Sequence, residues 1–403
     1  MLKDLDFEMG KSGLDAVIVS GESTSTSPEL YYVTRASLPR GGIYVKKSGQ
    51  DPLLVVSGID VANAKKGVVR DVASYSEYGY EKDARRWRPE IAAAALYRRL
   101  LSHAGVTGRV GIYGRLDFNR SLALARRLQG YGYRVVAESP PALFERVMAT
   151  KTDDEIRRIG QVGKLVQEIV IEVKEQLRRC KTRSGALVHE GRRLTAGAVK
   201  RLIRARMADD GLVPVEGLIF APGRRSYNPH YEGSEGDKVR PGEPVVIDLF
   251  PRSVDNLYFD LTRTLLVGRA KGAVRRMHEA VAEAHDRAIE MAGEGVKACE
   301  LMHGACDVFE SQGFKTLRSL VDGASRRLDS GFVHSLGHGV GWTLGDRPSL
   351  TLQSRDVLRV GSVFTIEPGL YDRRVGGVRI EDVVAVTSKG VKRLSDIDYS
   401  LAV

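Results

Sequence analysis

Four acidic residues stand in segments whose other residues predict buried strands. Asp248 interrupts the apolar run 244–250, and Asp260 follows twelve residues later in a second apolar segment. Glu367 and Glu381 stand in two further apolar runs near the end of the sequence. A carboxylate buried alone is costly, and its pKa shifts rather than leave a charge in apolar surroundings. Four of them together therefore require a shared cation.

A histidine completes this set. His338 stands between two glycines, which let the backbone pack closely around its imidazole. Any one acid could be a solvated strand end or a salt-bridge partner, but that explanation is poor for all five residues together. Four carboxylates and one imidazole suit two divalent ions, and the oxygen-rich set favours Mn²⁺, with Co²⁺, Zn²⁺ and Fe²⁺ left open. Two such ions lower the pKa of a water between them, so we predict a metal-dependent hydrolase.

The composition excludes several classes of protein. The 403 residues are 42% hydrophobic and 28% charged, which argues against disorder, collagen and a membrane bundle. Residues 1–10 carry acids among apolar residues and no apolar segment follows them, so no targeting signal is expected. No stretch approaches the roughly 18 apolar residues that a transmembrane helix requires.

The three cysteines are not arranged for a structural role. Cys180, Cys299 and Cys306 form no CxxC pair. An odd number without such a pair argues against a disulfide framework and against a cysteine zinc site. A reducing cytoplasm is the simplest location for such a protein.

The sequence is basic. Lysine and arginine total 62 against 51 for aspartate and glutamate, a net charge of +11. The excess is dispersed in short pairs such as Arg192-Arg193 and Arg275-Arg276, without a long basic run or interleaved aromatic residues. We therefore expect a solvated basic surface, with neither nucleic acid nor membrane among the partners.

Hydrophobic periodicity divides the sequence into two domains. Residues 1–148 alternate helix and strand signals and predict an α/β domain, whereas residues 149–403 predict an α+β domain. The second domain opens on a helix capped by Thr152, with Glu155 completing a capping box. The predicted helices span 2–11, 89–101, 119–130, 195–207, 274–292 and 298–312. The predicted strands of the first domain span 15–20, 42–45, 53–56, 110–113 and 133–136.

Six groups of residues in the second domain carry the motifs of a known family. They are 151–156, 228–231, 247–249 with 258–264, 334–341, 365–371 and 378–382. In this order they resemble the M24 metallopeptidases, the pita-bread-fold family of methionine aminopeptidase, Xaa-Pro aminopeptidase and prolidase. The first domain resembles the creatinase/prolidase N-terminal domain, which methionine aminopeptidases usually lack. The resemblance therefore implies a pita-bread catalytic domain at 149–403 and the Xaa-Pro branch of the family.

The resemblance implies a metal role for each of the five residues. Asp248 would bind one metal, and Asp260 and Glu381 would bridge both. His338 and Glu367 would complete the second metal, with Glu367 also the general base for the attacking water.

The resemblance adds three catalytic residues beside the metals. His230 and His334 match histidines that hold the substrate and the oxyanion of the intermediate. Arg379 matches an arginine that lies near Glu381 and orients the ligands. Family members are often dimers, so a homodimer acting on a peptide substrate is expected.

The sequence departs from the family pattern in two places. The two aspartates usually lie eleven residues apart and here lie twelve apart, and the extra residue falls in a turn-rich segment that a longer loop or bulge can absorb. Xaa-Pro enzymes also usually carry a further histidine where this chain has Gly345, which has no side chain to contact a substrate. Asp346 follows where an acid is common, and a turn aspartate is the preferred interpretation.

Three functions are compatible with these motifs. The leading one is hydrolysis of the peptide bond before proline, in Xaa-Pro dipeptides or at the N-terminus of longer peptides. A second is hydrolysis of another small amide on the same fold, which Gly345 would permit. A third is a non-catalytic binding protein of the same fold, which should have lost metal ligands, and none of the five is lost.

Overall fold

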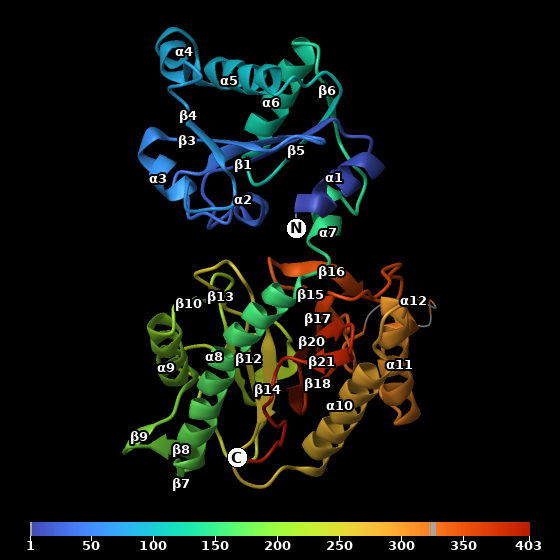
Figure 1. The fold of residues 1–403 in the computed structure, drawn as a ribbon. Coiled ribbons are helices and arrows are strands. Elements are labelled where there is room, and N and C mark those ends of the chain that lie inside the picture. Colours follow the sequence, from blue (N-terminus) through green and yellow to red (C-terminus); the bar gives the residue numbers. More distant parts are fainter. Residues whose placement is uncertain (1, 322, 324–327) are drawn as a thin grey trace. The chain divides into compact units, whose positions relative to one another are not determined.

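The computed structural model describes residues 2–321, 323 and 328–403 (Figure 1). The chain forms two compact units, Met1–Met148 and Ala149–Val403. Each unit has its own apolar core, so each is described by itself. Within the described residues, no helix combines the length and the apolar character that crossing a membrane requires.

The first unit is a mixed sheet with helices on both faces (Figure 1). Its strands follow the order β4-β3-β2-β1-β5-β6, in which β1 pairs parallel with β5 and antiparallel with β2. The strands are β1 (Ala16–Gly21), β2 (Gly42–Lys47), β3 (Leu53–Val56), β4 (Asp71–Ser74), β5 (Arg109–Tyr113) and β6 (Arg134–Val136). The helices are α1 (Leu2–Lys11), α2 (Pro28–Thr34), η1 (Gly58–Asp60), α3 (Val61–Ala64), α4 (Tyr80–Arg86), α5 (Pro89–His103), α6 (Phe118–Gly130) and α7 (Leu143–Val147).

The second unit begins with its longest described helix. In α8 (Asp153–Arg178), the Thr152 hydroxyl accepts from the Glu155 amide at 3.3 Å and the Glu155 carboxylate accepts from the Thr152 amide at 2.9 Å, which confirms the predicted capping box. The other helices are α9 (Ala196–Asp209), η2 (Gly223–Tyr227), α10 (Gly272–Met291), α11 (Ala298–Ser311) and α12 (Arg318–Val321). Helices α10 and α11 pack on a core shared with strands of the larger sheet.

Two sheets of the second unit contain or border the five predicted metal ligands. One has the order β11-β12-β14, and the other the order β16-β15-β17-β20-β21. Their strands are β11 (Ile219–Pro222), β12 (Val245–Leu249), β14 (Leu261–Leu265), β15 (Gly337–Val340), β16 (Leu344–Leu350), β17 (Val363–Ile366), β20 (Asp382–Thr387) and β21 (Gly390–Arg393). Three small sheets join β18 (Gly369–Asp372) to β19 (Gly376–Arg379), β10 (Leu212–Val213) to β13 (Arg252–Ser253), and β7 (Lys181–Arg183), β8 (Ala186–His189) and β9 (Arg192–Arg193) to one another.

The prediction that Asp260 and Glu381 lie within strands is wrong. Asp260 immediately precedes β14, and Glu381 lies in the connection between β19 and β20. The apolar residues around each acid do form strands, but the acid stands at a strand end. Side chains at strand ends can converge from different sheets, which residues in mid-strand cannot do as easily.

The extra residue between the two aspartates lies in a turn. Strands β12 and β14 keep a continuous antiparallel ladder in which Asp248 pairs with Thr262 and Leu249 with Leu261. The connecting segment contains β13 and then Asn256, whose φ of 56° lies in the left-handed region that asparagine tolerates. The longer loop therefore leaves the pairing next to Asp260 unbroken.

Candidate metal centre

All eight residues that the sequence assigned to the site line one cavity of about 330 Å³. The cavity lies entirely in the second unit. The eight are Asp248, Asp260, His338, Glu367, Glu381, His230, His334 and Arg379. They come from segments up to 151 residues apart in the chain, so only the folding of both sheets brings them together.

Backbone pairing fixes the positions of the acids. Asp248 lies in β12, paired with Thr262. The Thr262 carbonyl accepts from the Glu381 amide at 3.0 Å, which joins the end of β20 to β14. The Thr262 hydroxyl also donates to Glu381 Oε2 at 2.7 Å. One threonine thus ties two of the predicted ligands to one another.

Two glycines bring His338 to the acids. A Cβ on Gly337 would lie 2.1 Å from the Thr365 carbonyl oxygen, and a Cβ on Gly339 would lie 2.2 Å from the Asp346 carbonyl oxygen. No larger residue fits at either position without moving backbone. This agrees with the expected role of the glycines on either side of the histidine.

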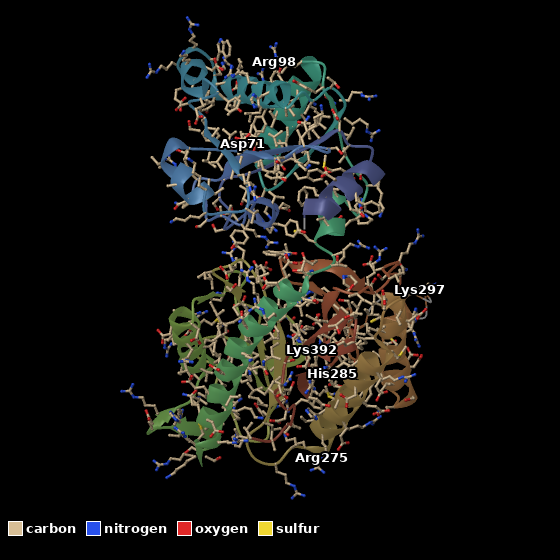
Figure 2. All side chains as sticks on the ribbon, viewed as in Figure 1. Asp71, Arg98, Arg275, His285, Lys297 and Lys392 are labelled. Atoms are coloured by element: carbon tan, nitrogen blue, oxygen red, sulfur yellow. The ribbon has the colours of Figure 1, made fainter. Side chains whose placement is uncertain are left out.

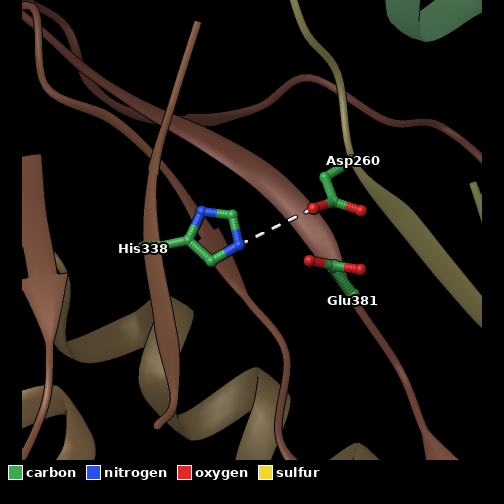
Figure 3. Close-up of side chains that lie close together, drawn as sticks. All are labelled: Asp260, His338 and Glu381. Carbon is green, nitrogen blue, oxygen red and sulfur yellow. Dashed lines mark ion pairs between the residues drawn. The ribbon is translucent and has the colours of Figure 1, made fainter. Parts of the chain in front are cut away.

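Asp260, His338 and Glu381 form a group that could hold a metal ion (Figure 3). One potential ligand atom from each lies within 4.8 Å of the others. His338 Nε2 is 3.6 Å from Asp260 Oδ2 and 3.5 Å from Glu367 Oε1. His338 Nδ1 lies 3.1 Å from the Gly339 carbonyl oxygen, which can only accept, so the ring proton belongs on Nδ1. The Nε2 lone pair is therefore directed at the carboxylates.

Three carboxylate oxygens in this cavity are buried without a hydrogen-bond partner among the described residues. They are Asp248 Oδ1, Asp260 Oδ1 and Glu381 Oε1. An unpaired buried carboxylate oxygen is costly, and a cation removes that cost. The predicted ligands therefore fit divalent metal ions in two respects. They are oxygen and nitrogen donors, and three of their buried oxygens have no other partner among the described residues.

The carboxylates raise one another's pKa values. Burial and then Glu381 raise the pKa of Asp260 well above its ordinary value. Burial and then Glu367 do the same for Glu381. Burial raises the pKa of Glu367 to about 8, with Arg379 opposing this shift. Such crowding keeps protons on the acids unless cations share the site.

Arg379 connects the acids to a histidine through Tyr371. The Arg379 guanidinium contacts Asp248 Oδ2 and donates to the Tyr371 hydroxyl at 2.8 Å. The Tyr371 hydroxyl lies 3.0 Å from His334 Nε2, while His334 Nδ1 lies 2.8 Å from the Ser335 carbonyl oxygen. The carbonyl places the ring proton on Nδ1, so Nε2 accepts from Tyr371. Burial, and then Arg379, lower the pKa of His334 to about 3, which keeps the ring neutral.

The other predicted histidine has a different environment. His230 is exposed, and its ring makes no hydrogen bond to another described residue. It follows η2 in the segment where the Asn228 side chain accepts from the His230 amide at 3.1 Å. Its imidazole can therefore contact a bound molecule directly.

Gly345 and Asp346 lie in β16, directly after the bend at residues 341–343. Gly345 has a φ of 113°, and a Cβ there would meet no atom within 4 Å. Leu344, and not Gly345, lines the cavity. Asp346 is buried and accepts from the Trp342 amide at 2.9 Å, from the Thr343 hydroxyl at 2.7 Å and from Lys151 Nζ at 2.9 Å. The interpretation of Asp346 as a turn aspartate is therefore wrong, because it is a strand residue whose carboxylate binds the residues of the preceding bend.

Sequence reasoning missed three residues that orient the site. Thr262 bonds Glu381, Thr365 donates to Glu367 Oε1 at 3.3 Å, and Tyr371 links Arg379 to His334. All three stand inside the motifs that carried the family resemblance. Each lies two or four residues from a predicted ligand, on a strand that pairs at the site. This spacing was the signal in the sequence that could have found them.

Comparison with known proteins identifies the family. Residues 157–388 match metallopeptidase family M24. The chain belongs to this family. It is 27% identical over 394 residues to the Xaa-Pro dipeptidase of Pyrococcus furiosus, covering 98% of this chain and 97% of that protein. It is 34% identical over 185 residues to the Xaa-Pro dipeptidase of Lactobacillus helveticus, covering 46% of each protein.

Solved structures show the same fold along the whole chain. The prolidase of Pyrococcus horikoshii OT3 matches with a TM-score of 0.75 and 25% identity over 99% of both chains. The Xaa-Pro dipeptidase of Bacillus anthracis matches with a TM-score of 0.79 and 21% identity, covering 100% of this chain and 99% of that one. The predicted family and the pita-bread fold are therefore confirmed, and the chain is a metallopeptidase whose family uses divalent metal ions.

Proposed function

We propose that this metallopeptidase hydrolyses the peptide bond before proline, in Xaa-Pro dipeptides or at the N-terminus of longer peptides. The observation that carries the proposal is the convergence of five ligand-type side chains, three of them with unsatisfied buried oxygens, in one cavity. Similarity over almost the full chain to proteins named Xaa-Pro dipeptidase supports the choice of substrate. A non-catalytic protein on this fold would have no need of such a ligand set.

The proposed metal ligands are Asp248, Asp260, His338, Glu367 and Glu381, with Asp260 and Glu381 shared between two ions. The oxygen-rich set favours Mn²⁺, with Co²⁺, Zn²⁺ and Fe²⁺ as alternatives. When bound, the ions would polarise the scissile carbonyl and make a water nucleophilic near neutral pH.

Glu367 is the proposed general base. Thr365 orients its carboxylate. Cations in the site would keep this carboxylate ionised and so able to accept a proton. It would take the proton of the attacking water and pass it to the departing proline nitrogen. Arg379 would hold Asp248 in place through their contact.

His230 and His334 are the proposed substrate contacts. The free ring of His230 can donate to a carbonyl of the peptide. Both ring nitrogens of His334 are already bonded, to the Ser335 carbonyl and the Tyr371 hydroxyl, so its neutral ring would contact the substrate by packing against it in a fixed plane. The apolar wall of Ile219, Phe250 and Leu344 offers a surface for the proline ring and excludes water from it.

A substrate panel tests the proposal. Xaa-Pro dipeptides, Xaa-Pro tripeptides and peptides with an N-terminal methionine would be assayed with Mn²⁺, Co²⁺ and Zn²⁺ in turn. We expect cleavage before proline, highest with Mn²⁺, and no release of methionine from peptides without proline in the second position. Cleavage of the methionine peptides alone, or of none of the peptides with any metal, would overturn the proposal.

We further propose a homodimer in a reducing cytoplasm, with neither nucleic acid nor membrane as partner. The three cysteines are unpaired, which agrees with a reducing compartment. Arg98, Arg275 and Lys392, which Figure 2 labels, lie in α5, α10 and β21 and so belong to no common run of basic residues. Light scattering at several protein concentrations would measure whether the protein is a dimer. A titration with duplex DNA at several salt concentrations would measure whether it binds nucleic acid.

A further inference from the structure

One acid in the wall of the cavity lies outside the proposed ligand set. Glu216 lines the cavity that holds Asp248 and the other ligands, in the segment between β10 and β11. It is exposed, and it makes no hydrogen bond or ion pair with another described residue. A free carboxylate at the edge of a substrate cavity is available to a cation that enters from solvent.

The strand register places Glu216 beside the apolar wall. Ile219 in β11 pairs with Asp248 in β12, and both line the cavity. Phe250 follows two residues after Asp248 and lines it as well. Because β11 and β12 are antiparallel, the residues that precede Ile219 and those that follow Asp248 lie toward the same end of the pair. Glu216 therefore stands where the apolar wall of Ile219 and Phe250 reaches solvent.

A second carboxylate lies next to this segment. A Cβ on Gly217 would lie 3.5 Å from Glu232 Oε1, so the Glu232 side chain passes close to the backbone that follows Glu216. Glu232 has a cationic partner, because the buried Lys200 Nζ lies 3.7 Å from Glu232 Oε2 and donates to the Glu232 carbonyl at 3.2 Å. Glu216 is therefore the acid at this edge that has no ion-pair partner among the described residues.

The guanidinium inside the cavity does not neutralise this edge. Arg379 is buried, contacts Asp248 and donates to Tyr371. Its guanidinium is thus engaged with Asp248 and Tyr371 and does not pair with Glu216. A positively charged substrate group that reaches Glu216 therefore meets a carboxylate that is free to pair with it.

We propose that Glu216 gives the enzyme a preference for peptides with a positively charged side chain on a residue that adjoins the proline. This inference rests on the proposed Xaa-Pro activity and adds a substrate class to it. The lysine or arginine either precedes the proline or follows it. The chemistry recognised is the same in both cases, and the substrates below separate them.

Charged and uncharged substrates of similar size test the proposal on the full-length, metal-loaded protein. The values of kcat/KM would be compared for Lys-Pro against Leu-Pro, and for Leu-Pro-Lys against Leu-Pro-Leu. The variants are Glu216→Gln and Glu216→Lys. The matched control is Glu294→Gln, because Glu294 is exposed, makes no hydrogen bond or ion pair with another described residue and lies outside this cavity.

We expect the wild-type enzyme to favour the lysine substrate about threefold in one of the two pairs, as an exposed ion pair allows. The preference should appear in KM and shrink at high salt, where exposed charges are screened. Glu216→Gln should remove the preference and Glu216→Lys should reverse it, whereas Glu294→Gln should match the wild type. The pair that responds identifies whether the charged residue precedes or follows proline.

Two results would contradict the inference in different ways. A lysine-to-leucine ratio that is the same in the wild type, Glu216→Gln and Glu216→Lys would overturn the role of Glu216 and leave the proposed activity standing. A wild-type enzyme that cleaves none of the four peptides would overturn the proposed activity and this inference with it.

Discussion

The orientation of His338 is set by its own backbone neighbour. The Gly339 carbonyl holds the ring proton on Nδ1, and Nε2 then faces Asp260 and Glu367. A metal ligand needs a free lone pair, so this single bond selects the tautomer that can bind. The two glycines beside the histidine permit the close backbone approach on which that bond depends.

Replacement of one proposed bridging ligand should remove metal and activity together. Asp260→Asn keeps the size of the side chain but replaces a charged oxygen with an amide. We expect kcat/KM for an Xaa-Pro substrate to fall by more than about 100-fold, since even partners outside the ligand set cost about 10- to 100-fold. Activity assays and elemental analysis after dialysis would measure both effects.

Asp255→Asn is the control for that variant. Asp255 lies in the turn before the same strand, is 57% exposed and pairs with Arg158 at 2.9 Å. It should retain wild-type metal content and activity. Full activity in Asp260→Asn would contradict the proposed two-metal centre.

The backbone conformation at Gly345 disfavours any residue with a Cβ. This constraint adds to the absence of the histidine side chain that the family usually carries here. The φ of 113° at Gly345 is strained for any residue with a Cβ, although the space around it is open. We expect Gly345→His to lower the free energy of unfolding by about 1–3 kcal/mol, because a non-glycine residue is held in a sparsely populated conformation.

Gly345→Ala separates the backbone from the imidazole. Gly345→Ala should lower the free energy of unfolding by about as much as Gly345→His, because the strain arises at Cβ. Chemical denaturation of both variants would measure this. If Gly345→His proved as stable as the wild type and raised kcat, this part of β16 would be able to adopt the usual family geometry, and strain at this position would be refuted.

At the scale of elements, a buried ion pair joins Lys151, just before α8, to Asp346 in β16. Lys151 and Asp346 have side chains 0% and 2% exposed and lie 2.9 Å apart. Asp346 also closes the preceding bend through the Trp342 amide and the Thr343 hydroxyl. Leu344, which follows that bend, lines the cavity. The pair therefore positions one wall of the site.

Breaking this pair should loosen the wall. Lys151→Met leaves the Asp346 charge buried without its cation, which costs about 3–5 kcal/mol of stability. KM for an Xaa-Pro substrate should rise several-fold while metal content stays unchanged, because the bend contributes no proposed ligand. Urea unfolding, steady-state kinetics and elemental analysis would measure the three effects.

Lys174→Met provides the comparison. Lys174 pairs with Asp398 at 3.0 Å, but the aspartate is 60% exposed, so the loss should stay below about 1 kcal/mol. Equal losses of unfolding free energy in Lys151→Met and Lys174→Met would show that the difference in burial does not make the two ion pairs contribute differently.

At the scale of the whole second unit, a network of buried charges lies behind the site. Arg263 donates to Asp382 Oδ1 at 2.7 Å, to the Glu381 carbonyl at 2.6 Å and to the Ile397 carbonyl at 2.8 Å. His285 of α10, labelled in Figure 2, contributes Nε2 at 3.1 Å from Asp382 Oδ2. The network joins β14, β20, α10 and the last segment of the chain.

This network predicts how stability depends on acid pH. Burial opposes ionisation of Asp382, but Arg263 and His285 outweigh it and lower its pKa from 3.8 to about 2. A pKa that is lower in the folded state means that the unfolded chain binds the proton first as the pH falls. The stabilisation is therefore complete above pH ~4 and is lost as the pH falls through about 2, and it amounts to about 2 kcal/mol.

Asp382→Asn should remove the stabilisation that depends on the ionised Asp382 carboxylate. We expect the variant to be less stable than the wild type at pH 7, and the gap between the two to narrow between pH 4 and pH 2. Urea unfolding across that range would measure the gap. Asp71→Asn, at an exposed position of the first unit, should follow the wild type. A gap that stays constant with pH would contradict the assigned pKa of Asp382.

The sequence by itself determined the family, the fold class and eight of the residues that line the cavity. Acids such as Asp248 in apolar runs, and a histidine between glycines, are informative because burial makes an unshared charge too costly to leave unexplained. The capping box at Thr152 was equally readable, because its two bonds join residues three apart.

Only the tertiary structure decided how those residues meet. It placed Asp260 and Glu381 at strand ends, assigned the ring protons of His334 and His338, and paired Asp346 with a lysine 195 residues away. It also put Glu216 at the edge of the same cavity. The strand ends, the ion pair and the cavity depend on contacts between segments far apart in the chain, and local periodicity does not show which distant side chains will meet. The ring protons are set by the carbonyl of the next residue, but only the folded backbone brings that carbonyl to the ring.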